Sequence, residues 1–69
     1  MYIVYFFDSV GVKVVALSFG ALRDAFLYAR TFARNQRMSH NELYIEYCHG
    51  GGCQLIGDIG QVALQHFAS

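Results

Sequence analysis

The chain has 69 residues, 55% of them apolar and 14% charged, and its five Lys and Arg residues balance five Asp and Glu residues. High hydrophobicity without net charge excludes an intrinsically disordered chain, an acidic mimic of DNA and a nucleic-acid binder that relies on overall charge. A chain of this length forms a single domain, here residues 1–69.

The first part of the chain predicts a β-hairpin. Tyr2–Phe7 consists of aromatic and β-branched residues, which favour a strand buried on both faces, and it is too short for a signal peptide or a membrane span. Asp8–Gly11 supplies turn residues, and Val12–Leu17 is a second β-rich run with Lys13 as its one charge. Two such runs around a short polar turn predict an antiparallel pair of strands.

A helix is predicted from Phe19 to Arg37, because the apolar residues there follow a helical period. Ser18 is expected to cap this helix by accepting a hydrogen bond from a free N–H of the first turn. Small and large apolar residues alternate on its expected core face: Phe19, Leu22, Ala25, Phe26, Ala29, Phe32 and Ala33. This alternation favours close packing of the helix on a sheet.

The rest of the chain predicts a second hairpin and a short helix. Glu42–Cys48 alternates apolar and polar residues, and Cys53–Gly57 returns as a strand after a glycine-rich turn. Asp58 and Gln61 have the spacing of a capping box, which favours a short helix over residues 59–67 rather than a fifth strand. The predicted fold class is α+β: an antiparallel four-stranded sheet in ββαββ order, one long helix on one face and a short C-terminal helix.

The predicted long helix carries all four arginines of the chain along one stripe. They lie within about 60° of one another on a helical wheel, beside the core face. The candidate partner-binding residues are these arginines, the leucine that accompanies them, and one tyrosine as a second contact: Arg23, Leu27, Arg30, Arg34, Arg37 and Tyr44. Arginine forms planar, bidentate hydrogen bonds with carboxylates and phosphates, so the stripe predicts docking to an acidic protein or to a nucleic-acid backbone. The alternative is a solvated flank whose arginines pair loosely with the acids of the sheet.

The two cysteines flank the glycine-rich turn, so Cys48 and Cys53 should face each other across the second hairpin. Three states are open: two reduced thiols, a disulfide, or a zinc site that adds His49 and either His40 or His66. Reduced thiols are favoured, because the expected compartment is the cytoplasm and the chain has no second metal-binding pair. No metal and no cofactor are therefore expected.

Catalytic motifs are missing from the sequence. There is no Ser-His-Asp spacing, no P-loop and no dinucleotide fingerprint, so the chain is predicted not to be an enzyme. Tyr44 also argues against an RNA-binding sheet, since Glu42 and Glu46 beside it would repel phosphate. Tyr and Arg are, in contrast, enriched at the energetic centres of protein interfaces.

The order of elements resembles that of small phage-encoded inhibitors of bacterial defence, including anti-CRISPR proteins. The resemblance lies in the strand ending at Leu17-Ser18, the Ala-rich helix from Ala21 to Arg34, and the hairpin from Glu42 to Gly57. It implies a non-enzymatic protein without cofactors that covers a site on a host protein in the host cytoplasm. The resemblance concerns layout, so it assigns no individual residue.

The function expected from the sequence is thus a small cytoplasmic module that binds a larger host protein with an acidic surface. A homodimer is expected as well, because the apolar content exceeds what one small core can bury. No membrane partner is expected, and nucleic acid is disfavoured. The alternative is a small nucleic-acid-binding module or ribonuclease toxin that uses the helix arginines against phosphates.

Overall fold

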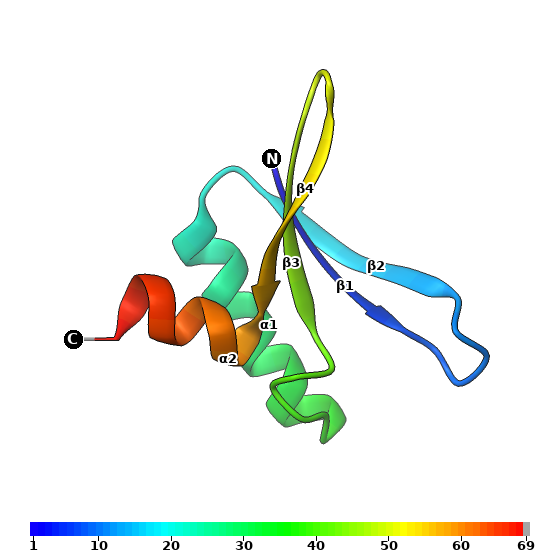
Figure 1. Ribbon diagram of the computed structural model, residues 1–69. Coiled ribbons are helices and arrows are strands. Elements are labelled where there is room, and N and C mark those ends of the chain that lie inside the picture. Colours follow the sequence, from blue (N-terminus) through cyan, green and yellow to red (C-terminus); the bar gives the residue numbers. More distant parts are fainter. Residues whose placement is uncertain (69) are drawn as a thin grey trace.

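The computed structural model describes residues 1–68, which form one sheet covered by helices on one side (Figure 1). The elements in chain order are β1 (Tyr2–Phe7), β2 (Lys13–Phe19), α1 (Leu22–Gln36), β3 (Tyr44–His49), β4 (Gly52–Asp58), α2 (Ile59–Val62) and a π-helical turn, η1 (Ala63–Phe67). The four strands are antiparallel and lie in the order β2-β1-β3-β4. The predicted α+β fold class is therefore confirmed.

The core lies between the sheet and α1. Ala25, Ala29 and Ala33 on α1 are fully buried or nearly so, and they pack with Val4 of β1 and Ile45 of β3. Alanine side chains are short, so they let the helix backbone approach the sheet closely. The predicted alternation of small and large residues on this helix face thus corresponds to the face that is buried.

The predicted start of α1 is wrong. Ser18 and Phe19 belong to β2, where they pair with Ile3 and Tyr2 of β1, and the N-cap of α1 is Ala21, whose side chain makes no capping hydrogen bond. Because Ser18 and Phe19 pair with β1 as part of the sheet, Ser18 is not available to cap the helix. Phe19 still contributes to the core, with its ring 5.2 Å from that of Tyr28.

The end of α1 also lies inside the predicted range. Arg37 is the C-cap, with a left-handed φ of 56°, and its backbone N–H donates to the carbonyl of Arg34. The N–H of Met38 donates to the carbonyl of Ala33, which closes the last turn. The helix is therefore 15 residues long, shorter than the predicted Phe19–Arg37.

The second hairpin begins two residues later than predicted. Glu42 lies in the preceding turn, where its carboxylate accepts a hydrogen bond from the N–H of Ser39 at 2.8 Å. Opposite Ile45, Gly57 has a φ of +150°, and an added Cβ there would lie 2.9 Å from Oε1 of Gln61. A residue larger than glycine would therefore displace the Gln61 side chain.

The predicted capping box is confirmed, and with it the C-terminal helix. Oδ1 of Asp58 accepts from the N–H of Gln61 at 2.8 Å, and Oε1 of Gln61 accepts from the N–H of Asp58 at 3.0 Å. Ile59 and Val62 of α2 are fully buried in the core, and Phe67 of η1 stacks on Phe26 of α1. The tail therefore packs against α1 as a helix, and the fifth strand does not form.

Candidate functional site

One flank of α1, beside its buried face, carries the predicted arginine stripe. Its residues follow one another at intervals of three or four, and all of them are exposed; together they define the basic surface, made of Arg23, Leu27, Arg30, Arg34 and Arg37. Leu27 exposes 42% of its surface between the first two arginines. The basic surface therefore combines four positive charges with one apolar side chain between Arg23 and Arg30.

The arginines of the basic surface have no carboxylate partner among residues 1–68, where the ion pair is Lys13–Glu46 on the sheet. The other acids on the sheet side bond elsewhere: Asp8 accepts from two backbone N–H groups of the first turn, Glu42 accepts from Ser39, and Asp58 caps α2. Pairing of the arginines with the acids of the sheet is thus not observed in this part of the chain.

One arginine contacts an aromatic ring. The guanidinium carbon of Arg30 lies 5.5 Å from the centre of the Phe26 ring, and that ring stacks on Phe67 at 4.5 Å. A guanidinium over an aromatic face is held by the ring quadrupole, which costs none of its hydrogen-bonding capacity. Arg30 is therefore oriented yet free to bind a carboxylate.

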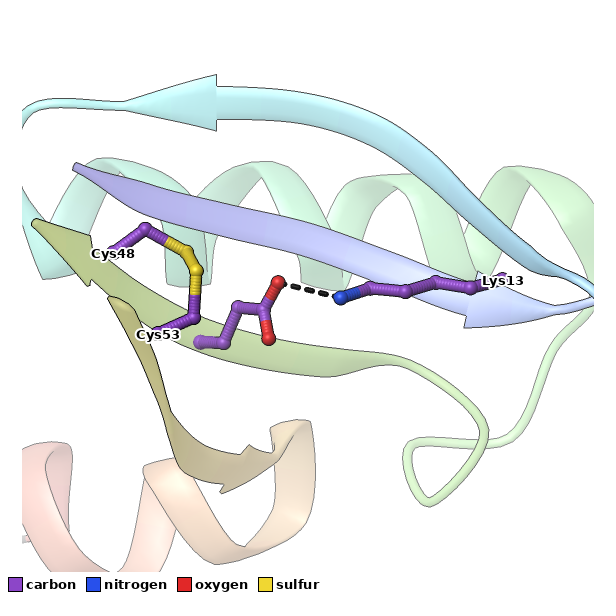
Figure 2. Close-up of polar contacts among 4 residues, drawn as sticks. Lys13, Cys48 and Cys53 are labelled. Carbon is purple, nitrogen blue, oxygen red and sulfur yellow. Dashed lines mark hydrogen bonds and ion pairs between the residues drawn. A yellow bond between two sulfur atoms is a disulfide. The ribbon is translucent and has the colours of Figure 1, made fainter. Parts of the chain in front are cut away.

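The face of the sheet opposite α1 is not covered by any element of residues 1–68. We call it the open sheet face; its side chains come from all four strands and include Ile3, Tyr5, Phe7, Lys13, Val15, Tyr44, Glu46, Leu55 and the two cysteines. Figure 2 shows Lys13, Cys48 and Cys53 in front of the sheet, with α1 behind it.

Tyr44 lies on the open sheet face and not beside the arginines. Its neighbour Ile45 points into the core against α1, so Tyr44 points the other way and stacks on Tyr5 with 5.4 Å between ring centres. Phe7 meets the same tyrosine edge-on at 5.9 Å. The structure therefore brings the five residues of the basic surface together and places the sixth candidate on the other side of the molecule.

A short ion pair crosses the open sheet face. Nζ of Lys13 lies 2.7 Å from Oε1 of Glu46, the contact drawn as a dashed line in Figure 2. The same nitrogen lies 4.3 Å from the centre of the Tyr5 ring. Burial raises the pKa of the Tyr5 phenol above its usual value, the Glu46 carboxylate raises it further, and the Lys13 ammonium opposes both. Lys13 therefore lies flat along the sheet and neutralises the Glu46 carboxylate.

Cys48 and Cys53 form a disulfide, so the prediction of two reduced thiols is wrong. The residues are direct partners in the β3–β4 register, with 4.0 Å between their Cα atoms, and Figure 2 shows the bond between the strands. Glu46 and the two sulfurs lie within 4.8 Å of one another, but a disulfide offers no thiolate to a metal. His49, the nearest histidine, is on the other face and contacts Tyr47.

The sequence predicts exposed apolar surface, because its apolar content exceeds what one small core can bury, but it does not identify the residues that provide this surface on the open sheet face. Phe7, Val15 and Leu55 expose 51%, 54% and 56% of their surface. Tyr2–Phe7 was expected to be buried on both faces, yet α1 covers only one of them. The sequence does contain a signal for exposed apolar residues. Every residue of Val12–Leu17 except Lys13 is apolar, so neither face of this strand is polar.

No family model, curated protein or solved structure is significantly similar to this chain. No pocket is found on the part of the molecule formed by residues 1–68. Within the same residues, none of the helices has the length and hydrophobicity needed to span a membrane.

Proposed function

We propose that this protein is a small, non-enzymatic binding module that docks on an acidic surface of a larger protein through the basic surface of α1. The observation that carries the proposal is that four exposed arginines on one side of a neutral molecule have no carboxylate partner in residues 1–68. Arginine binds carboxylates in a bidentate manner and is enriched at the centres of protein interfaces. Leu27 adds an apolar contact between them.

The specific form of the proposal is an inhibitor of a bacterial defence protein that acts by covering a site on its target. The support for this form is the ββαββ order, which phage-encoded inhibitors of this kind share. A rigid helix is a suitable carrier for such a surface, because packing on the sheet fixes the spacing of the arginines before binding.

Charge reversal at Arg23 is expected to abolish partner binding without unfolding the protein. Arg23 is in the first turn of α1, where a carboxylate is favoured by about 0.3–1 kcal/mol, so Arg23→Glu should not lower stability. Proteins captured from nuclease-treated bacterial lysate are purified and titrated against the wild type and the variant. We expect at least about a tenfold loss of affinity for Arg23→Glu.

Asn35→Glu is the matched control, since it adds a carboxylate to an exposed position of α1 that is not three or four residues from any member of the basic surface. Its affinity for the captured protein should stay within about threefold of the wild type. Equal affinities for wild type and Arg23→Glu would contradict the proposed site.

Salt dependence separates the proposed function from nucleic-acid binding. Four arginines that each neutralise a phosphate of duplex DNA would lose about 4000-fold in affinity over a tenfold rise in salt. We expect no measurable binding to mixed-sequence duplex DNA or single-stranded RNA at physiological salt. Tight binding with that steep slope would instead identify a nucleic-acid-binding module.

A further inference from the structure

The sheet has an outer face that lacks the composition of a solvated one. An antiparallel sheet with one face in water normally carries polar side chains on that face. Here Phe7, Val15 and Leu55, on three different strands, each expose more than half of their surface. Val10 and Val12, in the turn of the first hairpin, are 79% and 56% exposed, and Figure 1 shows this hairpin projecting past α1. The fold thus has two layers, the sheet and the helices, and residues 1–68 leave the second face of the sheet uncovered.

We propose that a second copy of this chain packs on the open sheet face and forms a two-fold symmetric dimer with the two sheets stacked face to face. The inference does not depend on the proposed function, because it uses the side of the molecule opposite the basic surface. A two-fold interface uses the same patch on both copies, so this patch must be complementary to itself.

The charges of the open sheet face satisfy that requirement. The face carries the Lys13 ammonium and the Glu46 carboxylate, which already pair at 2.7 Å. Consider a two-fold axis that is parallel to the two stacked sheets, lies midway between them and crosses the line from Lys13 to Glu46 at a right angle. This axis places Lys13 of each copy over Glu46 of the other. Two like charges therefore never meet, and every ionic group that becomes buried has partners of opposite sign.

The dimensions of the face also fit a stable dimer. The molecule is a slab of 31 × 29 × 15 Å, and the sheet forms one of its broad sides. A standard interface buries about 800 Å² per partner. That is less than a fifth of the 4510 Å² accessible surface of the chain. Stacked sheets pack about 10 Å apart, a spacing that the flat Tyr5–Tyr44 pair and the Lys13 side chain lying along the sheet allow.

The test is the molar mass in solution, measured by sedimentation equilibrium over a concentration series. We expect the wild type to be a dimer with a dissociation constant below about 10 μM. Leu55→Lys places a charge on the open sheet face and should shift the protein to monomer, with at least a hundredfold weaker association. Val15→Lys, on the opposite edge strand of the same face, should have the same effect.

Leu64→Lys is the matched control, because Leu64 is 77% exposed on η1, away from the open sheet face. It carries the same substitution as Leu55→Lys and should remain dimeric. Circular dichroism establishes that each variant is folded. A wild type that is monomeric at about 100 μM would overturn the proposal. So would folded Leu55→Lys and Val15→Lys variants that dimerise as well as the wild type, since the contact would then lie elsewhere, for example along the free edge of β2.

Discussion

Replacing Leu43 by Ala is expected to unfold a large fraction of the protein at room temperature. Leu43 is fully buried just before β3, and its carbonyl accepts a hydrogen bond from the N–H of Ile59 at the start of α2. Removing a buried leucine side chain costs about 2–5 kcal/mol through lost transfer energy and the cavity that remains. The whole free energy of unfolding of a chain of this length is about 3–10 kcal/mol, so the loss is comparable to the total.

Leu64→Ala gives the matched control for this prediction, because it is the same substitution at a position that is 77% exposed. Its free energy of unfolding should stay within about 0.5 kcal/mol of the wild type. Urea denaturation followed by circular dichroism, at one fixed protein concentration, measures both variants. Equal midpoints for the two would show that Leu43 is not part of the core.

Reduction of the Cys48–Cys53 disulfide is expected to lower the free energy of unfolding by about 2 kcal/mol. The bond closes a loop with a sequence separation of five, and a cross-link of that size removes a limited amount of entropy from the unfolded chain. Most of the core lies toward the other end of the hairpin, near Ile45 and Ile59, so the reduced protein should remain folded.

The measurement is a pair of urea denaturation curves for the wild type, with and without reductant. The Cys48→Ser/Cys53→Ser variant should match the reduced wild type and should not respond to reductant. The outcome that would contradict the disulfide in solution is a wild type that reacts with a thiol reagent at both cysteines before any reduction and whose urea midpoint is the same with and without reductant.

Periodicity predicted most of the fold because it reports directly on which side chains are buried. The spacing of Ala25, Ala29 and Ala33 identified the inner face of α1, and the pair Asp58 and Gln61 identified the last helix from two reciprocal hydrogen bonds. Both signals are local, so no knowledge of the tertiary structure was required. The stripe of arginines beside the buried face of α1 follows from the same helical period.

The predicted start of α1 failed because it depended on longer-range structure. Whether Ser18 caps a helix or extends a strand is decided by β1, which offers it a partner at Ile3. The prediction for Cys48 and Cys53 failed for a different reason: the sequence places them opposite each other, as the structure does, but the reduced state was inferred from the expected compartment, which the residues themselves do not determine. The side on which Tyr44 lies is, in contrast, predictable, because the alternation in Glu42–Cys48 places Tyr44 on the face opposite Ile45, as the structure has it.

The strand order also determines how the chain must fold. Each hairpin joins neighbours in sequence, so β1 with β2 and β3 with β4 can pair after closing only a short loop. The central pairing of β1 with β3 is different, since β2 and all of α1 lie between Tyr5 and its partner Tyr44 in the sequence. Closing that long loop costs conformational entropy before the core repays it, which slows folding in proteins dominated by non-local contacts. The two hairpins, β1–β2 and β3–β4, can therefore form early. The rate of folding is then set by the step in which β1 pairs with β3.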